Sequence, residues 1–332
     1  MKFENFIGID ISKKTIDVVL YNQKDDKKSD YKQFSNEKEG FEQMIQWVKR
    51  KINSLKTTLF SLEHTGVYSY NIAIFFEEKG YTYTLLVPLQ IKRSMGIVRG
   101  KSDKSDAYII AKYSYLYREE IPINKIKSDI VFKLKSLLSE RQSFIKNLVK
   151  EKQKLKEQKH FLSDSAIERS QKIQKQIVNF IKQIDLEIKD LIKIDTEIKK
   201  NFELITSVKG IGLINAIVFI INTNNFKQIT DPRKYASYCG VAPFEYSSGT
   251  SIKGKTKVSP IANKFAKAML TTAAMSAKEN DGELKKYYNR KTKEGKAYGV
   301  VLNAIKFKLI TRVYAVIRRQ TPYVELPQVG QD

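Results

Sequence analysis

Four carboxylates in the first 106 residues have the types and spacing of a metal site. Asp10 lies inside an apolar, strand-like segment, and Glu63 directly follows another one. Asp103 and Asp106 are three residues apart at the start of a predicted helix, so they share one helical face. Because a carboxylate within an apolar strand is costly to bury, we expect Asp10 to have a function.

Clustered carboxylates repel one another unless cations neutralise them. Ligand sets made only of oxygen suit Mg²⁺ or Mn²⁺. Two such ions, about 3.5–4 Å apart, can activate an attacking oxygen and stabilise a leaving oxygen at a phosphodiester. Taken singly, Asp103 and Asp106 would be ordinary acids of a helix start, and Glu63 a surface residue at a strand end. Taken together, the four acids predict a metal site.

The hydrophobic pattern of the first 120 residues predicts the elements that must bring these acids together. Strands are predicted at 3–12, 15–22, 31–35, 57–62 and 81–87, and helices at 38–53, 67–79 and 105–118, with Pro88 ending the last strand. This order is that of a ribonuclease H-like α/β fold with a mixed sheet. In such a sheet the first and fourth strands are neighbours and the last helix packs beside their ends, so all four acids would meet.

The remaining chain divides into a helical arm and a second folded region. Glycine and proline are absent from 124 to 209, and apolar residues recur at heptad spacing, at Ile177, Ile181, Ile184, Ile188 and Leu191. We predict a long helical hairpin or coiled coil, broken near 162–165, that serves as an intrachain spacer or as a dimerisation arm. The predicted domains are therefore 1–122, 123–200 and 201–332.

The third region is predicted to be mainly α-helical. Helices are expected at 213–221, 262–277 and 298–319, with another ending near 240, and 243–256 is expected to be a loop rich in glycine, serine and lysine. Lys209, Gly210 and Gly212 form a turn between helices that resembles the phosphate-binding turn of helix–hairpin–helix proteins. The alternative is a tight turn with no ligand.

The charge favours a polyanionic partner. The 332 residues carry a net charge of +24, which rises along the chain from +4 in residues 1–120 to +8 in 121–200 and +12 in 201–332. A lysine bias of the whole proteome would be spread more evenly. The gradient therefore favours a nucleic-acid surface in the later regions.

Several protein classes are excluded by composition. A single cysteine, Cys239, with only His64 and His160 beside it, excludes a disulfide framework and a self-contained Cys/His zinc site. The longest apolar run, 211–221, is too short to span a membrane, and no signal peptide is recognisable. We expect a cytoplasmic protein in which Cys239 packs in the core.

Three motifs in the first half resemble those of the DEDD transposases. They are Ile7-Gly8-Ile9-Asp10-Ile11-Ser12-Lys13, Glu63-His64-Thr65-Gly66 and the segment 99–107 around Asp103 and Asp106. Segments 208–212, 238–243 and 248–249, followed by Lys264 and an alanine-rich helix, resemble that family's C-terminal domain. The resemblance covers nearly the whole chain, in the family's order. The DEDD transposase family consists of insertion-sequence recombinases and is related to the Piv and MooV invertases.

The resemblance implies a RuvC-like N-terminal domain and a C-terminal domain with a nucleophilic serine. Family members are recombinases guided by a noncoding bridge RNA that pairs with target and donor DNA. Their serine attacks the DNA backbone and forms a 5′-phosphoserine. The serine of one protomer acts beside the acids of another, in a dimer of dimers. The protein would thus be prokaryotic and act at the nucleoid.

The family's functional residues carry over onto this sequence by motif. The acids correspond to Asp10, Glu63, Asp103 and Asp106, and the serine to Ser248, because Gly249 follows it; Ser247 and Ser251 are rivals. Nucleic-acid contacts are expected from Lys209, Gly210, Gly212, Gly249, Lys253, Lys255, Lys257, Lys264 and Lys267. The sequence departs from the family pattern at Ala262, where a glycine is usual, and at Lys267, in the place of an arginine.

Serine is a weak nucleophile that needs a base or a metal. No histidine lies near Ser248 in the sequence, and His64 is expected to be a supporting or surface residue, so a metal held by the acids is the available activator. Three other hypotheses remain open. They are a metal-dependent nuclease or junction resolvase without a serine, an invertase without an RNA guide, and a binding protein with a decayed site. The sequence does not identify target, donor or guide.

Overall fold

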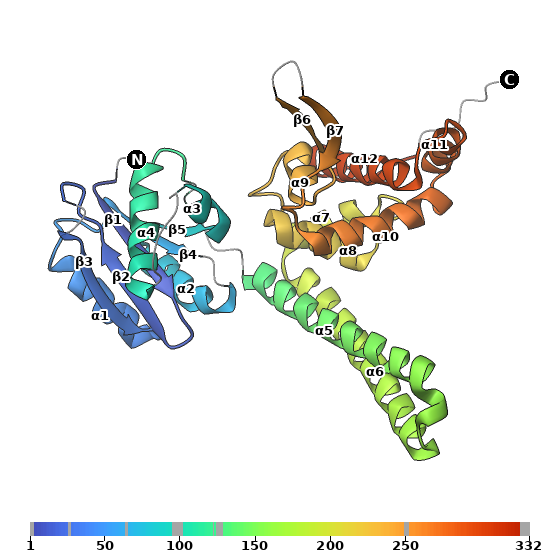
Figure 1. Ribbon diagram of the computed structural model, residues 1–332, viewed down its shortest axis with the longest axis horizontal. Coiled ribbons are helices and arrows are strands. Elements are labelled where there is room, and N and C mark those ends of the chain that lie inside the picture. Colours follow the sequence, from blue (N-terminus) through green and yellow to red (C-terminus); the bar gives the residue numbers. More distant parts are fainter. Residues whose placement is uncertain are drawn as a thin grey trace. The chain divides into compact units, whose positions relative to one another are not determined.

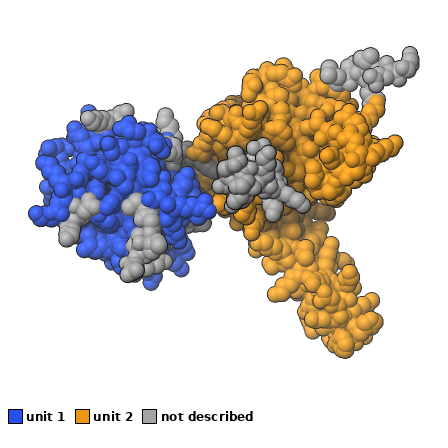
Figure 2. Space-filling view, turned by 45° about the horizontal axis from the view of Figure 1, so that its top comes forward, with its two compact units in different colours: residues 1–126 blue, residues 127–332 orange. Residues whose placement is uncertain are grey.

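The structure of the protein is a computed structural model that describes residues 3–25, 28–63, 66–94, 102–121, 123, 129–248 and 252–325. These residues form two compact units, Met1–Ile126 and Lys127–Asp332 (Figure 2). The predicted helical arm lies in the second unit together with the C-terminal helices. The finer division at residues 122 and 200 stays a prediction.

A five-stranded mixed sheet forms the centre of the first unit. Its strands are β1 (Asn5–Ile11), β2 (Thr15–Leu20), β3 (Asp30–Ser35), β4 (Thr58–Glu63) and β5 (Tyr83–Leu86), in the order β3-β2-β1-β4-β5. β1 is antiparallel to β2 and parallel to β4. The predicted adjacency of the first and fourth strands is confirmed, and the strand order is compatible with a ribonuclease H-like fold.

Helices cover both faces of this sheet (Figure 1). On one face, α1 (Lys38–Lys49) and α2 (Tyr70–Lys79), which follows the short η2 (Gly66–Ser69), bury apolar side chains against Ile7 and Ile9 of β1. On the other face, α4 (Asp103–Leu116) packs against Phe6 and Leu59. Alternate residues of a strand point to opposite faces, so Phe6, Gly8 and Asp10 all face α4.

Gly8 allows α4 to lie directly on β1. A Cβ atom at this position would overlap the carbonyl oxygen of Ala107 and the amide nitrogen of Ala111. Further along α4, the ring of Tyr115 lies 5.4 Å from that of Phe6. Because the C-terminal part of α4 contacts the start of β1, its N-terminal turn lies at the Asp10 end of that strand.

The second unit begins with the predicted helical hairpin, which is confirmed. α5 (Asp129–Gln158) and α6 (Asp164–Ile194) pack side by side and are joined through η3 (Lys159–Phe161) (Figure 1). Ile177, Ile184 and Ile188 of the heptad seam are buried. Ser163 caps α6 at the predicted break.

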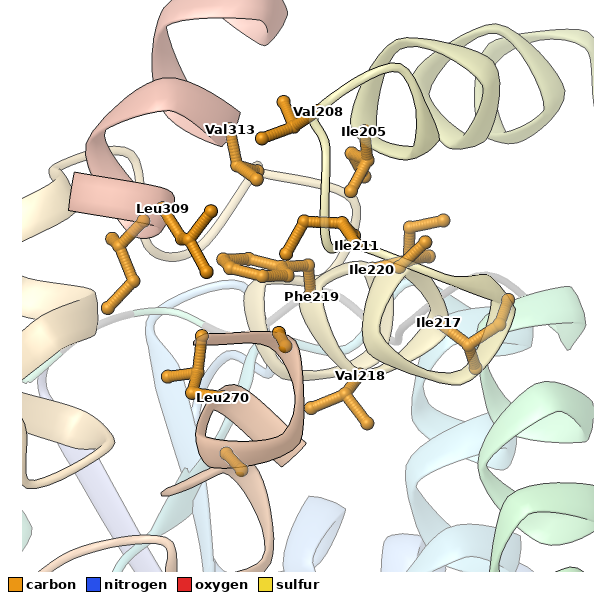
Figure 3. Close-up of a cluster of buried hydrophobic side chains, with 14 of the residues drawn as sticks. Ile205, Val208, Ile211, Ile217, Val218, Phe219, Ile220, Leu270, Leu309 and Val313 are labelled. Carbon is orange, nitrogen blue, oxygen red and sulfur yellow. The ribbon is translucent and has the colours of Figure 1, made fainter. Parts of the chain in front are cut away.

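Six further helices build the core of the second unit. They are α7 (Thr196–Thr206), α8 (Leu213–Thr223), α9 (Pro232–Tyr238), α10 (Lys264–Asn280), α11 (Gly282–Lys293) and α12 (Tyr298–Arg319). Side chains of α7, α8, α10 and α12 meet around Phe219, as Figure 3 shows. Within the described ranges, no helix has both the length and the apolar character needed to cross a bilayer.

One sequence prediction is corrected, and two helices were not predicted. The segment expected as a loop at 243–256 is a hairpin of β6 (Pro243–Ser248) and β7 (Ile252–Val258), because β-forming residues alternate along both strands. Pro88 does not only end a strand; it begins a short helix, α3 (Pro88–Ser94), where its missing N–H has no cost. α11 was not predicted, because only Leu284 of this helix is fully buried.

The packing of α4 on Gly8 gives a first prediction. Gly8→Ala should lower the free energy of unfolding of the first unit by about 1–3 kcal/mol, because the added methyl group overpacks a tight contact. The fluorescence of Trp47, the single tryptophan, reports on this unit alone, since its ring packs against Phe34. Glu42→Ala is the control in the same unit, because this side chain is exposed on α1 and its truncation should change the free energy of unfolding little. Equal effects of the two substitutions would contradict the packing argument.

Candidate active site

The first unit brings all four predicted carboxylates to one side of the sheet. Asp10 lies near the C-terminal end of β1, and Glu63 is the last residue of β4. The parallel register pairs Ile9 with Leu62, so Asp10 and Glu63 are neighbours on adjacent strands. Both belong to the set of alternate residues that faces α4.

The first turn of α4 supplies the other two acids. Ser102 caps the helix and forms a reciprocal capping box with Ser105, with N–H to Oγ distances of 3.2 Å and 3.0 Å. This fixes where the helix begins, two residues earlier than predicted. Asp103 and Asp106 then lie in the first turn of the helix, at the positive end of its dipole.

The four acids act on one another electrostatically. The pKa of Asp10 is raised from 3.8 to about 6, first by burial and then by the charges of Glu63, Asp106 and Asp103, while a hydrogen bond from the Ile11 N–H opposes the rise. As the described side chains stand, however, no three of the His, Cys, Asp and Glu residues are grouped as a metal site. The carboxylates share one field of negative charge without forming a coordination shell.

The donor set fits a hard divalent cation. All four side chains offer only oxygen, which Mg²⁺ and Mn²⁺ prefer. Burial and the neighbouring acids raise the pKa of Asp10, and a bound cation would favour its ionised form. Asp10, Glu63, Asp103 and Asp106 are therefore the residues that would hold the metal.

A fifth carboxylate on the same face was not predicted. Asp17 of β2 is directly opposite Asp10 in the antiparallel register and is only 1% exposed. It accepts hydrogen bonds from the Tyr31 hydroxyl at 2.6 Å and from Gln33 Nε2 at 3.1 Å. The hydrogen bond from the Tyr31 hydroxyl to Asp17 is the main reason why the pKa of Tyr31 is raised to about 12. The signal was present in the sequence, since Asp17, like Asp10, interrupts an apolar strand.

The predicted nucleophile lies in the second unit. Ser248 is the last residue of β6 and pairs with Ile252 of β7, while its rival Ser247 pairs with Lys253. Lys255 and Lys257 also lie in β7. Gly249 and Ser251, like His64 of the first unit, fall outside the described residues. Ser248 is thus at the end of a strand, next to the tip of the hairpin.

The predicted glycine turn is explained in part by packing. Gly210 has a φ of +91°, and a Cβ there would overlap Ala277 of α10, so the turn needs a glycine to approach that helix. Gly212 precedes α8, and Lys209 forms an ion pair of 2.7 Å with Glu325. The phosphate-binding role of this turn stays a prediction.

The remaining predicted residues lie around α10. Lys264 and Lys267 occupy its first two turns. Ala262, which stands where the resemblance leads us to expect glycine, faces Gly240 so closely that a Cβ on Gly240 would overlap it. Cys239 is buried, as expected, and burial raises the pKa of its thiol to about 12, so it is an inert core residue.

Comparison with known proteins gives two family matches. Residues 7–160 match a transposase family of the DEDD, IS110 type, and residues 202–289 match the transposase family IS116/IS110/IS902. The chain is 27% identical to the pilin gene-inverting protein of Moraxella bovis and 28% identical to that of Moraxella lacunata. Each alignment covers 96% of this chain and 98% of the relative. A protein of insertion element IS110 from Streptomyces coelicolor is 28% identical over 36% of this chain and 29% of its own length.

The raised pKa of Asp10 gives a second prediction. Because the folded protein holds this proton more tightly than the unfolded chain, the contribution of Asp10 to stability is present below pH 4 and is lost as the pH rises to about 6. Without metal, Asp10→Asn should therefore be more stable than the wild type at pH 7, with a smaller difference at pH 4. Mg²⁺ should stabilise the wild type and not the variant.

Trp47 fluorescence during urea unfolding measures this difference in the first unit. Glu42→Gln, an exposed acid on α1, is the control and should show no pH-dependent gain. A destabilised Asp10→Asn protein at pH 7 would contradict the electrostatic account.

Proposed function

The chain belongs to the IS110 family of transposases, and from this we propose that it cuts and rejoins DNA through a covalent serine intermediate, guided by a noncoding RNA. The observation that carries this proposal is the placement of four carboxylates on one side of a sheet in a chain that matches transposase families at both ends. We further propose that the first unit is a RuvC-like catalytic domain. Its strand order and the position of its acids support this.

The proposed chemistry is a pair of transesterifications. The Ser248 Oγ forms a bond to a DNA phosphorus, and the bond from that phosphorus to the 3′ oxygen breaks. The serine proton passes to a base in the carboxylate cluster, and the leaving 3′ oxygen takes up a proton from an acid of the cluster or from water and becomes a hydroxyl. In the second step the 3′ hydroxyl of another strand attacks the 5′-phosphoserine and releases Ser248, so no bond energy is lost to hydrolysis.

The carboxylates contribute charge and position. When bound, Mg²⁺ or Mn²⁺ supplies a Lewis acid that stabilises negative charge on the reacting phosphate. Asp10, Glu63, Asp103 and Asp106 would hold it, with the first turn of α4 fixed by its capping box. We propose that the serine and the acids which cooperate belong to different protomers in a dimer of dimers.

The charge of the second unit supports two nucleic-acid partners. Residues 127–332 carry a net charge of +19. We propose that this surface binds duplex DNA, both target and donor, and the guide RNA through their backbones. Base pairing would then read the sequence while the protein reads shape, as in other RNA-guided systems.

A second candidate is a site-specific DNA invertase that needs no guide RNA. The observation that favours it is the match over 96% of the chain to two proteins named pilin gene-inverting proteins. Inversion and insertion use the same strand chemistry and differ in the arrangement of the two sites. The two candidates therefore differ in their need for RNA and in the orientation of their sites.

The serine mechanism gives a third prediction. With element DNA labelled at its 3′ end, on the fragment downstream of the cut, the wild type should become covalently labelled after denaturation, and Ser248→Ala should lose this signal. Ser247→Ala is the matched control and should keep it. A metal-dependent nuclease would instead cut DNA equally well with Ser248→Ala, and that outcome would reject the serine mechanism.

The RNA guide gives a fourth prediction. Recombination of two sites in vitro should require RNA transcribed from the DNA flanking the gene, and changing the pairing segment of that RNA should redirect the target. Asp10→Asn should abolish recombination and retain RNA binding, measured by gel shift. Efficient inversion by the RNA-free protein would favour the second candidate.

A further inference from the structure

Lys306 is a buried lysine on α12. It is only 7% exposed, although lysine is rarely buried unless it is paired. Among the residues whose side chains the structure describes, it has neither a carboxylate nor a hydrogen-bond partner. Lys306 is thus a mostly buried lysine without a described counter-charge, and an anion bound there would lower the cost of its charge.

A second lysine adds to the same charge. Burial, and then the charge of Lys267 on α10, lower the pKa of Lys306, so the two ammonium groups act on each other across the contact between these helices. Lys267, with Lys264, also lies at the positive N-terminal end of α10, whose first turn contains no acid. Lys306, Lys267 and the N-terminal end of α10 thus bring three positive charges together, and a bound anion would relieve their repulsion.

These lysines lie at the base of the β6–β7 hairpin. The side chain of Asn303, one turn before Lys306 on α12, donates a hydrogen bond of 2.7 Å to the Val241 carbonyl, two residues before β6. The Lys267 Nζ lies 3.8 Å from the position that a Cβ on Gly240 would occupy. Strand β6, which ends at Ser248, therefore begins beside Lys306 and Lys267.

We propose that Lys306 and Lys267 form a binding site for a backbone phosphate of DNA at the base of this hairpin. β6 extends for about 16 Å from Pro243 to Ser248, at about 3.3 Å per residue. A DNA strand held at the base of the hairpin would follow it toward Ser248, and the held phosphate would lie several nucleotides along that strand from the attacked one. The choice of DNA rests on the proposed function, in which this hairpin carries the nucleophile.

The test combines the stability of the protein with the salt dependence of DNA binding. Lys306→Met removes the charge and keeps an unbranched chain, so it should raise the unfolding temperature in calorimetry without DNA. The same variant should weaken binding to a duplex several-fold. It should also reduce the slope of log K against log salt by about 0.9, the value for one lost phosphate contact. Lys306→Arg should keep the slope.

Lys308→Met is the matched control on the same helix, because Lys308 is already paired with Glu283 at 3.5 Å. It should leave the slope unchanged. A lower unfolding temperature for Lys306→Met, with an unchanged slope, would overturn the proposal.

A slope change with a structured RNA, and none with the duplex, would also overturn the choice of DNA. The test of the phosphate site and the test of the serine mechanism can fail independently of each other. If Lys306→Met reduces the slope while Ser248→Ala still cleaves DNA, the phosphate site stands and the proposed mechanism fails.

Discussion

The direct contact between α4 and β1 at Gly8 determines where the acids lie. Without a side chain at this position, the helix backbone approaches the sheet, and its direction places Asp103 and Asp106 beside the strand that carries Asp10. The parallel pairing of β4 then adds Glu63. Four residues from three separate segments of the chain thus share one field of negative charge. The burial of Asp10 within this field lowers the stability of the fold.

The two units hold opposite electrostatic imbalances. In the first, acids lie together with no basic residue among the described groups that shift the pKa of Asp10, and in the second, Lys306 and Lys267 lie together without a described anion. Each imbalance is unfavourable in the free protein and is relieved by a partner of opposite charge. A divalent cation and a DNA phosphate, the two partners of phosphodiester chemistry, meet these needs. In this account both charge clusters lower the stability of the free protein, and both bind a partner that the reaction needs.

Much of the fold followed from the sequence. The alternation in β1, β2 and β4 and the heptads of α6 have strong periods, and Asp10 was conspicuous because it interrupts an apolar strand. The β6–β7 hairpin was mistaken for a loop because glycine, serine and lysine hid its alternation. Asp17 interrupts an apolar strand as Asp10 does, so its signal was present in the sequence and was overlooked. Lys306 was missed for another reason, because its burial depends on packing between distant elements, which a local pattern does not contain.

The most direct test of the central claim is a crystal structure of the protein with Mn²⁺ and DNA, using the anomalous signal of the metal. The account predicts a manganese peak at bonding distance, about 2.0–2.3 Å, from Asp10 and from at least two of Glu63, Asp103 and Asp106. A manganese ion bound elsewhere, with these carboxylates left unliganded beside bound DNA, would contradict it.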